Sequence, residues 1–191
     1  VATAPGPLMA SVDEFRVIFT GLGGHAAMQH ETVDPIPAAA AFADGCQTIV
    51  SRNRDPIKPL VVSVTRIMSG GAALNIIPQT SEVGGTVRSF DADLRDLVEK
   101  RIRSLAAGVA EAYDLQAEVI YERSYPATVN HAKGTAFAAS VAAEIVGEDR
   151  VDDAVTPVMG SEDFAYMLEA RPGAYLFVGQ GDTPMCHHPA Y

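Results

Sequence analysis

The 191-residue sequence contains only two cysteines, Cys46 and Cys186, too few for the disulfide framework of a small secreted domain. Cys46 lies in an apolar, helix-like pattern, where a free thiol usually packs as a small hydrophobic side chain. No apolar run approaches the roughly 20 residues that a membrane-spanning helix requires. A disulfide-rich scaffold and a membrane span are therefore excluded, and we expect a reducing, cytoplasmic compartment.

Positive charge is also scarce, because 14 Lys and Arg stand against 24 Asp and Glu and leave a net charge of -10. The basic residues form no cluster that could neutralise phosphates. We expect neither nucleic acid nor an anionic membrane surface as a partner. What the chain does have is 48% hydrophobic residues, a composition typical of soluble globular proteins with a real core.

No basic segment followed by an apolar segment, the pattern typical of a secretion signal, opens the sequence. The first residue is Val1 rather than Met. Both features lead us to expect a processed or excised piece of a longer protein.

Between Ser11 and Arg123 the hydrophobic pattern alternates between strand and helix periods. Strands are predicted around Phe15 to Phe19, then at Leu60–Ile67, Glu82–Phe90 and Gln116–Tyr121, with helices over Asp34–Arg52 and from Asp91 to about Tyr113. The order β-α-β-β-α-β is typical of the ferredoxin-like arrangement, in which both helices cover one face of an antiparallel sheet. The fold class is therefore α+β.

The pattern changes after Arg123. A linker-like stretch precedes two predicted helices, Ala132–Val146 and Glu162–Leu168, and a short buried strand, Ala174–Val178. These elements are too few to close a core, so we expect an incomplete α/β domain that packs on chain absent here. The predicted domains are residues 1–10 as a leading segment and linker, 11–123 as one domain, and 124–191 as the incomplete one.

His25 stands in a Gly-rich loop after the first strand, where small residues allow close approach of a ligand. Such a His could stabilise an oxyanion, act as a general acid or bind metal, or simply pack in the loop. Asn75, in the connection from Gly70 to Gln79, could bind a substrate carbonyl or carboxylate, or make a turn bond. Arg88 could clamp a carboxylate, or form a salt bridge on an edge strand.

In the last third of the chain, Ser161 resembles a helix N-cap followed by acidic residues, and Gly160 before it could lie against a ligand. Near the end stand Cys186, His187 and His188. Consecutive residues of an extended segment point to opposite sides, so at most one or two could bind one ion. A catalytic zinc site needs about three protein ligands.

Several short motifs occur in a specific order along the chain. They are Pro5-Gly6-Pro7 with Met9-Ala10, Gly23 to Ala27 with His30 and Asp34-Pro35, Gln47 to Arg52, Asn75 to Pro78, Gly85 to Arg88, Gly160 to Phe164, Pro172 to Tyr175, and His187 to Tyr191. In this order they resemble the aminoacylase and hippurate hydrolase family of metal-dependent amidohydrolases, which includes auxin-conjugate hydrolases and carboxypeptidases. The resemblance spans essentially the whole chain.

The resemblance implies a two-domain enzyme in which an α/β catalytic domain holds two divalent ions, such as zinc, manganese, cobalt or nickel, and carries an inserted ferredoxin-like lid. It implies that residues 1–10 end a segment of the catalytic domain, that 11–123 are the lid, which often forms homodimers, and that 124–191 are the truncated C-terminal part of the metal-binding catalytic domain. Most metal ligands and the general base are expected upstream of Val1. His187 is the one metal ligand expected in this chain.

The resemblance also implies roles for individual residues. His25 would polarise the scissile carbonyl, commonly in the site of a partner subunit, while Asn75 and Arg88 would hold the substrate's carboxylate and amide. Gly160 would line the substrate cleft, and His30 would take part in substrate binding. Gln29 stands where relatives often have Pro, which leaves the pose of His30 open.

The function expected is hydrolysis of the amide bond of N-acyl amino acids or small peptides by metal-activated water, although the chain alone should be inactive. The alternative is a non-catalytic ferredoxin-like module for dimerisation or binding of a small ligand. That alternative gives no reason for the motifs at Gly160 to Phe164 and His187 to Tyr191.

Overall fold

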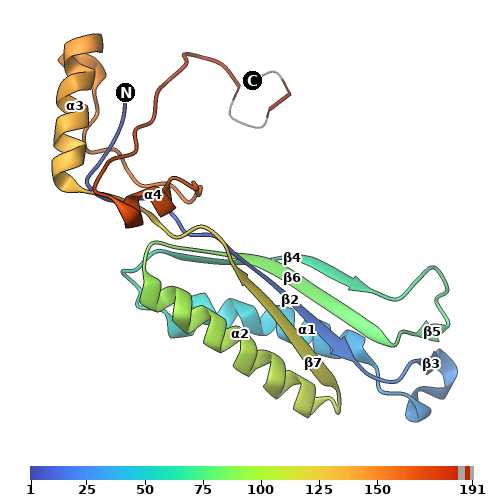
Figure 1. The fold of residues 1–191 in the computed structure, drawn as a ribbon. Coiled ribbons are helices and arrows are strands. Elements are labelled where there is room, and N and C mark those ends of the chain that lie inside the picture. Colours follow the sequence, from blue (N-terminus) through green and yellow to red (C-terminus); the bar gives the residue numbers. More distant parts are fainter. Residues whose placement is uncertain (185–187, 190–191) are drawn as a thin grey trace. The chain divides into compact units, whose positions relative to one another are not determined.

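The computed structural model describes residues 1–184 and 188–189 (Figure 1). The chain divides into two compact units, one formed by Ser11–Ala127 and the other by Val1–Ala10 together with Thr128–Tyr191. No helix in the described part of the chain is long and apolar enough to cross a membrane. The predicted His187 lies outside the described residues.

The unit Ser11–Ala127 is built on a four-stranded sheet with the order β4-β6-β2-β7, in which every neighbouring pair is antiparallel. Its main elements are β2 (Asp13–Thr20), α1 (Pro35–Thr48), β4 (Leu60–Ser69), β6 (Thr80–Ser89), α2 (Ala92–Ala112) and β7 (Gln116–Arg123). The shorter ones are β3 (Gly24–His25), the 3-10 helix η1 (Ala26–Glu31), the π-helix η2 (Ile49–Asn53) and β5 (Ile76–Ile77). Figure 1 shows α1 and α2 lying along the same face of the sheet.

Both long helices begin where the sequence predicts. The Asp34 carboxylate accepts a hydrogen bond from the backbone N–H of Ile36, and Pro35 occupies the first helical position. The Asp91 carboxylate caps α2 in the same way by accepting from Asp93 and Leu94. The predicted first helix, Asp34–Arg52, is divided in the structure, because its last turn is the π-helix η2.

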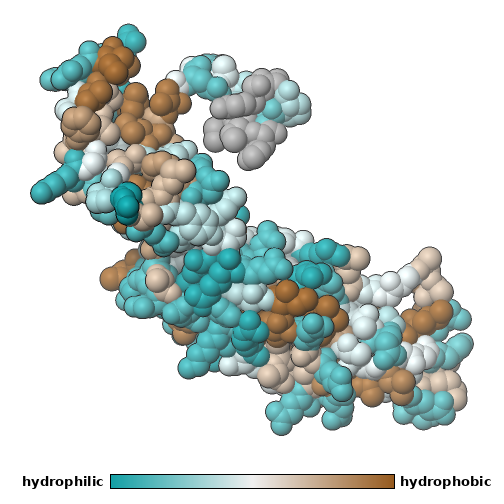
Figure 2. Space-filling view, in the orientation of Figure 1, coloured by the Kyte–Doolittle hydropathy of each residue, from teal (hydrophilic) through white to brown (hydrophobic). Residues whose placement is uncertain are grey.

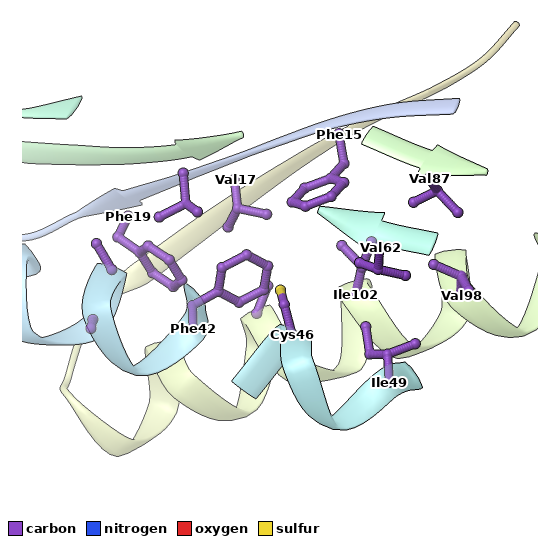
Figure 3. Close-up of a cluster of buried hydrophobic side chains, with 14 of the residues drawn as sticks. Phe15, Val17, Phe19, Phe42, Cys46, Ile49, Val62, Val87, Val98 and Ile102 are labelled. Atoms are coloured by element: carbon purple, nitrogen blue, oxygen red, sulfur yellow. The ribbon is translucent and has the colours of Figure 1, made fainter. Parts of the chain in front are cut away.

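The hydrophobic core of this unit lies between the sheet and the two helices (Figure 3). Phe15, Val17 and Phe19 alternate along β2 and are fully buried, as the period of two predicts. The ring of Phe42 from α1 packs edge-on against Phe15 and Phe19, at centroid distances of 6.4 and 5.7 Å. Cys46 is also fully buried here, which confirms its expected role as a core residue.

One glycine of β6 makes room for an aromatic ring. Gly85 pairs with Phe15 across the strands, and a Cβ atom at this position would lie 2.6 Å from Cζ of that ring. It would also lie 2.2 Å from the carbonyl oxygen of Ser63 on the other neighbouring strand. Position 85 therefore has no space for any side chain.

The second unit has less regular structure. It contains the antiparallel pair β1 (Gly6–Met9) and β8 (Thr128–Asn130), the helices α3 (Ala132–Val146) and α4 (Ala165–Ala170), and the 3-10 turn η3 (Glu148–Arg150). The α3 bounds agree with the predicted helix. An amide forms its polar centre: Asn130 Nδ2 donates to Thr3 Oγ1 and to the carbonyls of Ala4 and Tyr175, while Asn130 Oδ1 accepts from the Tyr175 N–H at 2.7 Å.

Two predictions for this unit are wrong. The helix after the Gly160 motif starts at Ala165 rather than Glu162, so Ser161 is not its N-cap. The Glu162 carboxylate instead accepts a hydrogen bond from the Tyr175 hydroxyl, which keeps this residue in the preceding loop. Residues 174–178 form no strand beyond a single bridge from Phe177 to Ala2, and Val178 is exposed.

Candidate functional site

The predicted site residues His25 and Asn75 come together although 50 positions separate them in the sequence. Strand β3 pairs antiparallel with β5, so that Gly24 lies opposite Ile77 and His25 opposite Ile76. The next residue, Ala26, donates its N–H to the carbonyl of Asn75 at 2.9 Å. The short β3–β5 ladder thus joins the Gly-rich loop to the connection that carries Asn75.

The His25 side chain is exposed, and its Nδ1 accepts a hydrogen bond from the Ala27 N–H at 3.1 Å. An Nδ1 that accepts cannot carry the proton of the neutral ring, so Nε2 is the donor atom of this tautomer. The cross-strand partner of His25, Ile76, is 60% exposed, whereas its neighbour Ile77 is buried. Because side chains alternate along a strand, the His25 ring and Ile76 share the solvent-facing side of the ladder.

His30 lies in η1, the same short helical segment that follows His25. Its side chain is exposed, and Nε2 lies 3.9 Å from the carboxylate of the adjacent Glu31, which is also exposed. An exposed pair at this distance contributes little stability. The structure therefore places His30 near His25 in the chain without a strong contact that fixes its ring.

Arg88 stands at the opposite end of the sheet from His25. It is half-buried near the end of β6, opposite Val61 of β4, while His25 follows the end of β2 that pairs with Thr80. Thr80 and Arg88 are eight residues apart, about 27 Å at the usual rise of a strand. Strand β6 lies between β4 and β2, so Arg88 does not stand on an edge strand, as the alternative had assumed.

In the other unit, Gly160 is exposed, and its carbonyl accepts a hydrogen bond from the Ala10 N–H at 2.8 Å. A Cβ atom at position 160 would lie 3.3 Å from the Met9 side chain, so the backbone there has little room to spare. Two residues later, the Glu162 carboxylate accepts from the Tyr175 hydroxyl at 3.2 Å. The motifs at Gly160 to Phe164 and Pro172 to Tyr175 are thus connected through one hydrogen bond.

The described part of the chain contains no complete set of metal ligands. Within residues 1–184 and 188–189 no three His, Cys, Asp or Glu side chains gather as a metal site would require. His25, His30 and Glu31 therefore do not gather into a metal site in this loop. The predicted ligand His187 is not among the described residues.

Comparison with known proteins identifies the family. Residues 23–191 match the model of peptidase family M20/M25/M40. The chain belongs to this family. It is 40% identical to the N-acetylcysteine deacetylase of Bacillus subtilis over 192 aligned residues, which cover all of this chain and 49% of that protein. It is 34% identical to the hippurate hydrolase of Campylobacter jejuni, over 97% of this chain and 48% of the relative.

A solved structure agrees with the sequence comparisons. The chain is similar to a dinuclear metal-binding M20 peptidase from Bacillus subtilis with a TM-score of 0.75 and 34% identity, over 99% of this chain and 47% of that one. This M20 chain therefore has the mixed α/β fold of an M20 peptidase, and it spans about half the length of the relatives that it matches. The resemblance to metal-dependent amidohydrolases predicted from the motifs is confirmed at the level of the family.

Proposed function

We propose that this chain is the substrate-recognition part of an M20 hydrolase that cleaves the amide bond of N-acyl amino acids or small peptides. The observation that carries the proposal is the β3–β5 ladder, which brings the backbone of His25, whose ring carries its donor proton on Nε2, next to the connection that contains Asn75. The names of the relatives, an N-acetylcysteine deacetylase and a hippurate hydrolase, support this substrate class.

His25 is the proposed catalytic residue of this chain. When water attacks an amide carbonyl, negative charge develops on the carbonyl oxygen, and a fixed N–H donor aimed at that oxygen lowers the barrier. The bond from Ala27 to Nδ1 leaves the proton on Nε2, the atom that points away from the backbone. The ring is therefore prepared to donate before substrate arrives, without first changing its tautomer.

Asn75 and Arg88 are the proposed substrate-binding side chains, with His30 and Gly160 lining the site. Arg88 suits the carboxylate of an N-acyl amino acid because its guanidinium can make two parallel hydrogen bonds to it. The length of β6 between His25 and Arg88 far exceeds such a substrate. We therefore propose a homodimer in which His25 and Asn75 of one copy act on substrate held by Arg88 of the other.

Divalent metal ions are the proposed cofactors, and the dinuclear metal-binding peptidase of this family supports them. The residues described here do not by themselves form a metal site, and His187 is proposed as one ligand. The chemistry explained by this chain's own residues is therefore substrate binding and stabilisation of the oxyanion.

The unit Ser11–Ala127 is proposed to be a ferredoxin-like lid, and the other unit part of the metal-binding catalytic domain. The order β4-β6-β2-β7 with both helices on one face supports the first assignment. A self-contained core would also suit the alternative, a non-catalytic module. The family match extends through the second unit to residue 191, and for this reason we favour the hydrolase.

The test uses the complete gene product supplied with zinc, manganese or cobalt, and measures hydrolysis of N-acetyl amino acids and hippurate. We expect turnover that disappears on chelation, and a loss of about 100- to 1,000-fold in kcat for His25→Ala, the range of a lost oxyanion donor. Arg88→Lys should mainly raise KM, because the ammonium group cannot make the paired contact. A metal-free, inactive product would refute the hydrolase, and unchanged turnover of His25→Ala would refute the role of His25.

A further inference from the structure

The side chain of Gln79 holds the Gly-rich loop before His25. The Gly23 N–H donates to Gln79 Oε1 at 3.1 Å, and Gln79 Nε2 donates to the carbonyl of Gly21. The backbone of Gln79 adds a third bond, since its carbonyl accepts from the Gly21 N–H at 3.0 Å. One residue therefore holds both ends of the turn that leads into β3.

The loop lies so close to this segment that it has no room for a side chain at Gly23. A Cβ atom at Gly23 would lie 2.8 Å from the carbonyl oxygen of Ile77 and 3.0 Å from the Gln79 nitrogen. Both neighbours are backbone atoms, which cannot move aside without disturbing the β3–β5 ladder. Gly23 therefore allows the close approach that the Gln79 amide needs.

The uncharged amide of Gln79 satisfies both polar groups of this turn with one side chain. The turn presents one N–H and one carbonyl to position 79, so the side chain must accept and donate at once. A carboxylate could accept from Gly23 but would set a negative oxygen against the Gly21 carbonyl, and an ammonium group could only donate. Gln79 is exposed, so burial does not determine which residue stands at this position.

We infer that Gln79 is a positioning residue for His25, acting through Gly21 and Gly23 on the pose of the imidazole. This inference rests on the proposed function, in which His25 donates to the oxyanion. His25 lies two residues after Gly23. On its other side, the backbone of His25 is held by pairing with Ile76 in the β3–β5 ladder. Without the amide, the turn is held only by hydrogen bonds between backbone atoms, and the direction in which His25 Nε2 donates is no longer fixed.

The test compares Gln79→Met and Gln79→Glu with the control Gln116→Met in the complete, metal-loaded gene product. Gln116 is an exposed glutamine at the start of β7, paired with Thr20 just before the same loop, so it controls for loss of a nearby amide. We expect kcat of Gln79→Met to fall about 10- to 100-fold with KM within twofold, as displacement of a catalytic group by about an ångström would cause. Gln79→Glu should also lose kcat, because its carboxylate can accept from Gly23 but repels the Gly21 carbonyl, and Gln116→Met should match wild type.

A double-variant comparison separates positioning from a general structural role. In a His25→Ala background, Gln79→Met should cause no further loss of kcat, because the group that it positions is gone. An equal loss in both backgrounds would overturn the inference, as would a kcat unchanged by Gln79→Met alone.

A second readout does not depend on turnover. The ¹⁵N resonances of the His25 ring should report a proton on Nε2 in wild type and in Gln116→Met, and tautomer exchange in Gln79→Met. If the complete product hydrolyses no acyl amino acid, the proposed function fails, while the His25 resonances still decide the link to Gln79. Identical His25 resonances in wild type and Gln79→Met would refute that link.

Discussion

The two units of this chain are stabilised in different ways. The unit Ser11–Ala127 closes a core of aromatic and aliphatic side chains between its sheet and helices. In the other unit, the described residues bury mainly small or polar side chains, and the helix α3 leaves Phe137 at 72% and Ile145 at 77% exposed. Figure 2 shows this hydrophobic surface over α3. The first unit therefore buries its hydrophobic side chains within itself. The second unit exposes an apolar surface of the kind that is usually covered by another protein surface.

The strongest test of this contrast is a pair of equal truncations, Phe42→Ala and Phe137→Ala. Phe42 is fully buried, so its loss should lower the free energy of unfolding by about 3–5 kcal/mol. Phe137 is mostly exposed, so its loss should cost less than about 0.5 kcal/mol. Urea denaturation of the 191-residue chain followed by circular dichroism measures both, and similar values would show that the contrast is false.

The polar centre of the second unit should be the next most sensitive position. Asn130→Ala removes the partner of Thr3, of the Ala4 carbonyl and of both backbone groups of Tyr175. We expect a loss of at least about 2 kcal/mol, because buried polar groups left without partners cost about 1–3 kcal/mol each. Hydrogen exchange should show faster opening of β8 and α3 with β2 and β6 unchanged, and a uniform change in both units would contradict the division.

A smaller, pH-dependent effect is expected on the surface of the first unit. Burial acts to raise the pKa of Glu99, but hydrogen bonds from Arg103 and Arg123 outweigh it and hold this pKa below its ordinary value of 4.5. The stabilisation is therefore fully present above pH 4.5 and is lost as the pH falls through the lower folded-state pKa. Glu99→Gln should cost at most about 1 kcal/mol at pH 6, since the pair is partly exposed.

Urea titrations of wild type and Glu99→Gln at pH 6 and at pH 3 measure this difference. It should shrink toward zero at the lower pH, and a constant difference would mean that the carboxylate's charge is not involved.

The smallest effect concerns a reaction rate. Burial raises the pKa of the Cys46 thiol to about 12, so the folded chain keeps it protonated and shielded at pH 8. In a Cys186→Ser background, Cys46 should react with a disulfide reagent only when the unit Ser11–Ala127 opens, and Phe42→Ala should accelerate that reaction. Asn130→Ala should leave the rate unchanged. Fast reaction of Cys46 in the Cys186→Ser protein, with Phe42 intact, would show that the first unit is not the more stable one.

Local sequence patterns predicted most of the secondary structure. The alternation of Phe15, Val17 and Phe19 and the caps Asp34 and Asp91 were sufficient to place β2, α1 and α2, because these features depend on neighbours within one element. The failures lie in the second unit, where Tyr175 holds Glu162 out of a helix and residues 174–178 gain no full strand partner among the described residues. Contacts between distant segments decide both cases, and periodicity does not contain them.

The same limit applies to the candidate site. His25, Asn75 and Arg88 could be chosen by residue type and motif, but their distribution over two ends of the sheet follows only from strand order. Gln79 could not be found from the sequence, because its partners Gly21 and Gly23 lie more than 50 residues away. Its contact with the loop becomes apparent only from the pairing of β3 with β5.

The ring of Phe15 over Gly85 also has a consequence for how the sheet assembles. Because the side-chain period of a strand is two, a slip of β2 by one residue would turn the Phe15 ring outward and bring its polar neighbours into the core. Pairing of β2 with β6 in the wrong register is therefore unfavourable, and Gly85 favours the native register of these two central strands. A larger residue at position 85 would clash with the Phe15 ring and the Ser63 carbonyl, and would therefore disfavour the native register of β2 and β6.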